Sequence, residues 1–240
     1  ALGTIERFTT GSVSNRTLTW TKHRIEIITM GRFDVVVDGT SVPTSAWGSK
    51  RSRTLLKRLV VARGWPVTRD ELIEVLWSEG GDLDRLGPRL SVQLSAVRRI
   101  LRGGVIADRS SIRLDLDHID VDIERWFSQT DDTVIVAGHA GDFLPDDRYE
   151  DWAAPLRDEI GARFGAAARR LAAVSRAADA IDLWRRALIQ DPYDERSHQS
   201  LVETLRAEGR HSEARTAYQT YVAAMEDLGV SSTSWDDIAR

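Results

Sequence analysis

The order of the elements predicted between Ile25 and Leu116 restricts the fold more than any other feature of the sequence. Residues 25–37 predict two short strands separated at Gly31, and Asp38-Gly39 predicts the turn that follows them. Three amphipathic helical segments come next, and a second pair of strands closes the region. Strands therefore lie on both sides of three consecutive helices.

The spacing of apolar residues defines the three helices. Residues 50–63 predict the first, with four apolar residues on one face. A capping-box pattern at Thr68 to Glu71 opens the second. The third is predicted from about Pro88, placed in its first turn, to Leu101.

A hairpin is predicted directly after the third helix. Gly103-Gly104 end that helix, residues 105–107 form the first strand, and residues 112–116 alternate apolar and polar side chains as the second strand. Strands, three helices and a hairpin in this order indicate a winged helix-turn-helix domain, which we assign to residues 25–118. Residues 1–24 are rich in Thr and Ser and are interpreted as a linker or the remnant of a preceding segment.

A repeat with a spacing of 34 residues organises residues 119–240. Ala180 corresponds to Ala214 and Trp184 to Tyr218, and Ala167 and Leu171 correspond to Leu201 and Leu205. Small and aromatic residues at these offsets are typical of tetratricopeptide helix pairs, in which the small residue lets two helices approach. With a further helix near residues 150–164, they predict a short all-α solenoid. The fold class is therefore mainly α with a small β component.

Charge is divided unequally between the two parts. Residues 25–118 contain 15 Lys and Arg against 12 Asp and Glu, whereas residues 119–240 contain 14 against 24. Two stretches of the first part, residues 49–63 and 85–107, contain six and five basic residues and no acidic residue. Phosphate backbones attract such stretches and repel the acidic half, so duplex DNA is the expected partner of the first part.

The third helix has one narrow apolar face and an acid-free opposite face. On a helical wheel Leu90, Leu94, Val97 and Leu101 fall within about 60° of arc. The opposite face carries small, amide and Arg side chains, which suit the major groove. Gln93 can pair bidentately with adenine, Val92 can contact a thymine methyl group, and Ser95 suits bases or phosphates.

Several classes of function find no support in the sequence. There are no cysteines, which removes disulfides and thiolate sites. The five histidines form no pair at metal-ligand spacing, and no phosphate-cradling loop or nucleophile–base constellation is recognisable. We expect no catalytic site, no metal and no cofactor. The longest apolar runs are about four residues, so no membrane span is expected and a cytoplasmic location is predicted.

Two parts of the sequence resemble the Streptomyces antibiotic regulatory protein family. R-L-S-V-Q-L-S-A-V-R-R-I-L at 89–101, with the basic run at 49–77, resembles the family's DNA-binding domain. G-D-F-L-P-D-D-R-Y-E-D-W at 141–152, continuing at 187–198, resembles its bacterial transcriptional activator domain. The resemblance covers residues 25–230, with both domains in the family's order. It implies a regulator that binds direct repeats near a promoter, whose helical domain supports homodimerisation or contacts RNA polymerase.

The resemblance also implies roles for individual residues. Val92, Gln93 and Ser95 would face DNA bases. The residues expected to hold phosphates are Arg89, Arg98, Arg99 and Arg102 on the third helix, Arg51 and Arg53 on the first helix, and Arg109 and Arg113 on the wing. Ala96 stands where the family often has Arg, and so removes one base contact.

An alternative interpretation is a protein-interaction adaptor. In that case the repeat domain binds a partner and the winged helix has little or no affinity for DNA. Ala96 and the weak overall basicity favour it, whereas the acid-free surface of the third helix favours DNA.

Overall fold

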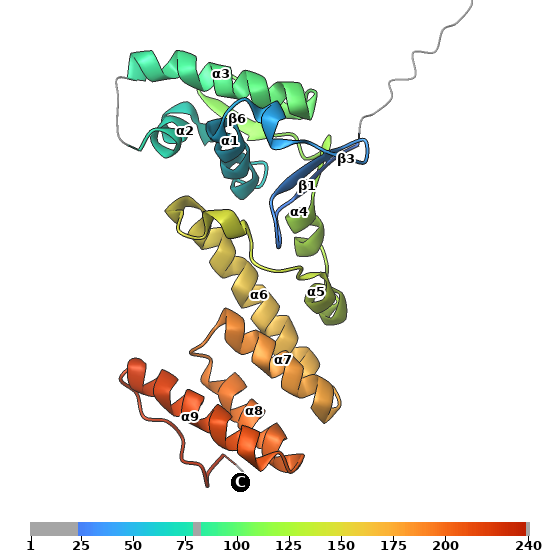
Figure 1. The fold of residues 1–240 in the computed structure, drawn as a ribbon, viewed down its shortest axis with the longest axis vertical. Helices are drawn as coiled ribbons and strands as arrows, with labels where there is room; N and C mark the ends of the chain where they lie inside the picture. The colour runs from blue at the N-terminus through green and yellow to red at the C-terminus, as the bar shows by residue number, and fades with distance from the viewer. Residues whose placement is uncertain (1–23, 79–82, 239–240) are drawn as a thin grey trace, which may run out of the picture.

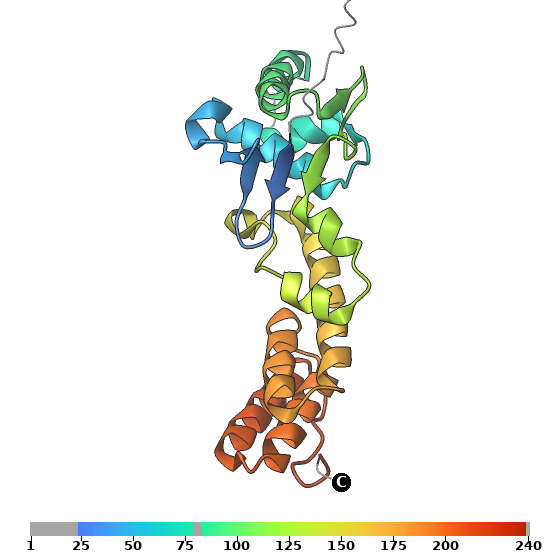
Figure 2. The same cartoon turned by 90° about the vertical axis from the view of Figure 1, so that its right-hand side faces the viewer.

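The computed structural model describes residues 24–78 and 83–238. The chain is elongated, with the strands and the first three helices at one end and a stack of helices at the other (Figures 1 and 2). The segment interpreted as a linker, residues 1–24, lies outside the described residues except for Arg24.

The first sheet combines strands from both ends of the winged-helix unit. It contains β1 (Ile25–Ile28), β2 (Asp34–Val37), β3 (Thr40–Ser41) and β7 (Ile119–Val121), in the order β3-β2-β1-β7. The two strands predicted around Gly31 are confirmed, and they pair antiparallel. β7 lies beyond the boundary expected after His118 and pairs parallel with β1. The sheet of the first unit therefore extends to Val121, a residue that sequence analysis placed in the helical part.

The three helices of this unit are α1 (Lys50–Val61), α2 (Arg69–Leu76) and α3 (Leu83–Leu101), preceded by the 3-10 turn η1 (Thr44–Trp47). Ser49 caps α1, and Thr68 caps α2 by accepting from the backbone N–H of Glu71, as the capping box predicts. α3 begins before the expected start, so that Pro88 lies inside the helix rather than in its first turn. Only one turn precedes Pro88, and few helical hydrogen bonds are lost there.

The wing is a second, three-stranded sheet. β4 (Val67–Thr68), β5 (Val105–Ala107) and β6 (Ser111–Leu114) have the order β4-β6-β5, and β5 and β6 form the predicted hairpin. Strands, three helices and a hairpin make residues 25–121 a winged helix.

The remaining chain is helical. Two short helices, α4 (Asp122–Phe127) and α5 (Asp132–Gly138), lead to the 3-10 turns η2 (Pro145–Asp147) and η3 (Asp151–Ala153). Two antiparallel pairs follow, α6 (Ala154–Ala172) with α7 (Ala177–Gln190) and α8 (Glu195–Ala207) with α9 (His211–Asp227). The repeat predicted at 34 residues relates these pairs, since Trp184 lies on α7 and Tyr218 at the equivalent place on α9. The tetratricopeptide-like architecture is confirmed.

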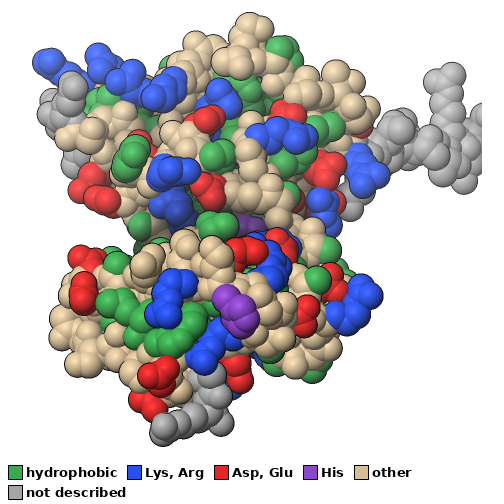
Figure 3. All heavy atoms as spheres, turned by 60° about the horizontal axis from the view of Figure 1, so that its bottom comes forward, with side chains coloured by type: hydrophobic (Ala, Val, Ile, Leu, Met, Phe, Trp, Pro, Cys, Tyr) green, Lys and Arg blue, Asp and Glu red, His purple; other side chains and the backbone are tan. Residues whose placement is uncertain are grey.

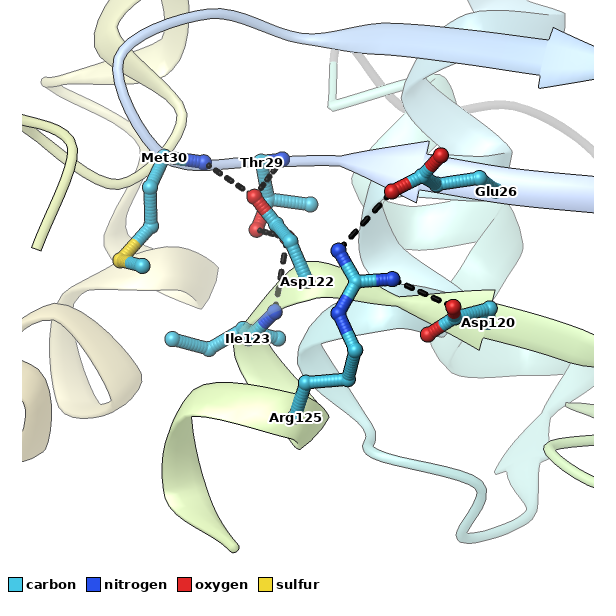
Figure 4. A network of polar contacts seen from close by, with 7 residues as sticks. All are labelled: Glu26, Thr29, Met30, Asp120, Asp122, Ile123 and Arg125. Atoms are coloured by element: carbon cyan, nitrogen blue, oxygen red, sulfur yellow. Dashed lines mark hydrogen bonds and ion pairs between the residues drawn. The ribbon is translucent and has the colours of Figure 1, made fainter. Parts of the chain in front are cut away.

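A carboxylate at the start of α4 joins the winged helix to the helical part. Asp122 accepts hydrogen bonds from the backbone N–H of Thr29 at 2.8 Å and of Met30 at 3.1 Å, and from the Thr29 hydroxyl at 2.5 Å (Figure 4). Arg125 pairs with Glu26 on β1 and with Asp120 on β7. We refer to these contacts of Asp122 and Arg125 as the β1 clamp.

A buried ion pair forms the second junction. Lys57 on α1 and Asp147 in η2 are 5% and 9% exposed, and the Lys57 ammonium donates to the Asp147 carboxylate. The ammonium also lies 4.8 Å from the centre of the Phe33 ring. Nearby, Leu144 donates its N–H to the carbonyl of Thr29. Most of the buried apolar side chains form one cluster that runs through both units, and a smaller cluster joins α8, α9 and Ile238. Among the described residues, no helix combines the length and apolar character that crossing a membrane needs.

Candidate nucleic-acid interface

One face of α3 is buried and the opposite face is open to solvent. Leu90, Leu94, Val97 and Leu101 are at most 4% exposed, which confirms the predicted apolar face. On the other side Val92 is 65% exposed, and Ser95 is also exposed. α3 lies at the end of the molecule farthest from the helical pairs, with the β5–β6 hairpin beside it (Figure 2). The face is therefore accessible to a large partner.

The arginines of this face differ in how firmly they are held. Arg89 and Arg98 are exposed and form no ion pair with any described residue. Arg99 donates to the carbonyl of Ala46 in η1 at 3.1 Å. Arg102 lies just after α3 and pairs with Asp38 at 3.0 Å. Figure 3 shows basic side chains gathered at the upper left, over the winged-helix end of the molecule.

Gln93 is bound to α1. It is half-buried, and its Oε1 accepts hydrogen bonds from the hydroxyls of Ser49 at 2.5 Å and Ser52 at 2.8 Å. These three side chains line a groove of about 590 Å³ that also includes Val92 and Arg99. Pairing with adenine, as predicted from the sequence, requires both the oxygen and the nitrogen of the amide. The structure places the oxygen in contacts within the protein.

A tight turn forms the tip of the wing. The backbone N–H groups of Ser111 and Ser110 donate to the Asp108 carboxylate, as do both hydroxyls, and these bonds lower the pKa of Asp108 to about 2. Arg69, at the start of α2, donates to the Asp108 carbonyl. Arg109 is exposed at this tip, and Arg113 is half-buried on β6. The wing thus presents Arg109 from an ordered turn.

The two arginines of α1 that were predicted to hold phosphates point to different places. Arg51 donates to the carbonyl of Leu76 at 3.1 Å and lies over the ring of Trp77, near the end of α2. Arg53 stacks over Phe33 and lines a groove with Lys57 and Asp147, toward the helical part. The structure therefore does not bring Arg53 together with the exposed face of α3.

Two buried polar residues were not predicted from the sequence. Asp147 pairs with Lys57, a lysine 90 residues earlier, and joins the two units. His198 is 3% exposed and packs against Tyr221 within the helical part. No local pattern indicates either contact, because Lys57 and Tyr221 are distant in sequence from the residues they meet.

Comparisons with known proteins agree with this order of units. The family model described as "Bacterial transcriptional activator domain" matches residues 137–234, which contain the two helix pairs. The transcriptional regulatory protein EmbR of Mycobacterium bovis and that of Mycobacterium tuberculosis are each 28% identical over 151 residues. These matches agree with the resemblance to the Streptomyces antibiotic regulatory protein family that the sequence shows.

The chain spans well under two thirds of the length of the curated relatives that it matches. The match covers 57% of this chain and 37% of EmbR. A solved structure of Mycobacterium tuberculosis EmbR in complex with a low affinity phosphopeptide shares the fold, with a TM-score of 0.70 and 21% sequence identity. The structural match covers 90% of this chain and 64% of the EmbR chain in that structure. The curated relatives are named as transcriptional regulatory proteins.

Proposed function

We propose that this transcriptional regulator binds duplex DNA in a sequence-specific manner, with the exposed face of α3 in the major groove. The observation that carries the proposal is that face: an accessible helix surface with four arginines on or beside it and no acidic residue from Arg85 to Leu101. A basic helix that carries no acidic residue after Asp84 and lies next to a wing suits contact with phosphates and base edges. Val92, Gln93 and Ser95 are the proposed base contacts. We place the main phosphate contacts at Arg89, Arg98, Arg99 and Arg102, with Arg51, Arg109 and Arg113 at the periphery.

The affinity for duplex DNA is expected to fall steeply with salt. Each arginine that displaces a counterion contributes about −0.9 to the slope of the logarithm of the binding constant against the logarithm of the salt concentration. With four such arginines, affinity falls roughly 100-fold between 50 and 200 mM salt. Fluorescence anisotropy with a labelled duplex measures this slope. A binding constant that does not respond to salt would contradict the phosphate contacts. Absence of any DNA binding, together with binding of a protein partner, would support the adaptor function instead.

Replacing Arg99 by alanine is expected to weaken binding to all sequences alike and to flatten the salt slope by about one unit. Arg99 is exposed, and its guanidinium donates to η1 beside the exposed face of α3. Arg176→Ala is the matched control, since its side chain is 91% exposed and lies in the helical part. Equal effects of the two variants would contradict the assignment of Arg99 to the interface.

We also propose that the helical domain contacts RNA polymerase or a second protomer and that the protein acts as an activator at promoter repeats. Two features support a protein partner there. The domain is strongly acidic, which disfavours DNA. A groove of about 680 Å³ runs between α6 and α8, with Trp184 and Arg196 in its lining. Sedimentation of the chain alone and with polymerase distinguishes the two partners, and Arg196→Glu is expected to weaken the contact that uses this groove.

A further inference from the structure

The contact between α1 and Gln93 leaves only one half of the amide available to a ligand. A carbonyl oxygen has two lone pairs, and the hydroxyls of Ser49 and Ser52 occupy both at 2.5 and 2.8 Å. The amide nitrogen has two N–H donors and no acceptor capacity. Gln93 lines the open groove beside Val92, so it offers donors to whatever lies against α3.

The two serines are themselves held in place. Ser49 is the N-cap of α1, and its Oγ accepts from the backbone N–H of Ser52, which leaves the Ser49 proton for Gln93. Ser52 is 1% exposed within the first turn of α1. Because both hydroxyls lie at the start of α1 and donate to the same oxygen, this arrangement directs the Gln93 amide nitrogen away from α1 before any ligand arrives.

We propose that Ser49 and Ser52 are positioning residues that determine the base preference of Gln93, an inference that rests on the proposed DNA-binding function. With its NH2 group directed outward, Gln93 selects base edges that carry acceptors. In the major groove guanine presents two acceptors, N7 and O6, whereas cytosine presents the N4 donor and adenine presents one acceptor and one donor. Gln93 therefore prefers guanine at one position of the operator, in place of the adenine that an unrestrained glutamine favours.

Reversing the amide tests the proposal. Ser49→Asp keeps a good N-cap residue but supplies only acceptors, so the Gln93 NH2 group turns toward Asp and Oε1 faces outward. Ser49→Thr retains both the cap and the hydroxyl donor and is the control. An operator is first selected from random DNA with the wild-type chain. The selected operator and its three single-base variants at each position then compete for the wild type and both substituted chains.

The expected result is a change of preference at one position. Ser49→Asp shifts that position from guanine toward cytosine or adenine by about tenfold, while Ser49→Thr keeps guanine. The negative charge of the new Asp also weakens binding to all DNA sequences equally. The competition cancels this effect, because it compares the four bases for the same chain. A folded Ser49→Asp chain that still prefers guanine, or that loses affinity equally for all four bases, overturns the proposal.

A second variant covers the case in which Ser49→Asp does not fold, as circular dichroism would show. Ser52→Ala removes one of the two donors and little volume, and it is expected to reduce the guanine preference several-fold without changing the salt slope. An unchanged preference in Ser52→Ala overturns the proposal in that case. Failure of the wild-type chain to bind any duplex in a salt-dependent way is a different outcome, because it contradicts the proposed function itself.

Discussion

Replacing Asp147 by alanine is expected to lower the free energy of unfolding by about 3–5 kcal/mol. The substitution leaves the Lys57 ammonium 5% exposed and without its carboxylate, in contact with the ring of Phe33. Removal of one partner of a buried pair costs more than the pair contributes, since the remaining charge is neither solvated nor compensated. Urea denaturation of the wild type and the variant measures the difference.

Two controls separate the ion pair from other causes. Asp146→Ala removes the exposed neighbouring acid and is expected to change stability by less than about 0.5 kcal/mol. The double variant Lys57→Met with Asp147→Leu replaces both charges by apolar groups and is expected to recover most of the loss. If Asp147→Ala were as stable as Asp146→Ala, the junction between α1 and η2 would not be formed in solution.

Replacing Trp184 by alanine is expected to cost about 3–5 kcal/mol, as truncations of large core aromatics do. Trp184 is 7% exposed on α7, where it packs among the small residues of the first helix pair, including Ala180 and Ala187. The substitution leaves a cavity that the neighbouring helices could close only by moving toward each other. Thermal and urea unfolding of the variant measure the cost.

The same helix offers the control for Trp184. Ile189 is 72% exposed on α7, and Ile189→Ala is expected to have little effect. The repeat relates Trp184 to Tyr218, which is half-buried and packs 5.3 Å from the Trp235 ring. Tyr218→Ala is therefore expected to cost less than Trp184→Ala. Unfolding of the Trp184 variant at the wild-type midpoint would contradict the packing of the first helix pair.

The winged helix and the repeat were predictable because their signals are local. The capping box at Thr68, the apolar face of α3 and the alternation in β6 are each contained in a few consecutive residues. β7 was not predictable in this way. It has three residues, and its partner β1 lies more than ninety residues earlier, so the pairing gives no periodic pattern.

The candidate interface was predictable in outline and not in its contacts. The helical wheel places Val92 and Ser95 outward, and the structure agrees. The same wheel cannot show that Gln93 is bound by Ser49 and Ser52, more than forty residues earlier. Nor does it show that Arg53 stacks on Phe33, since the geometry between helices is set by the tertiary packing.

The β1 clamp and the Lys57–Asp147 pair determine on which side of the DNA duplex a partner bound to the helical domain would lie. A domain on a flexible linker samples many positions around its point of attachment. Here the main apolar cluster, which runs from the winged helix into the helix pairs, and the polar contacts of Asp122 and Asp147 hold the helical domain in one orientation relative to α3. Once α3 occupies a major groove, the helical domain emerges from one side of the duplex only. B-form DNA turns once in about 10.5 base pairs, so moving the operator by half a turn carries that domain to the opposite side. For this protein, the rotational phase of the operator would then matter as much as its base sequence.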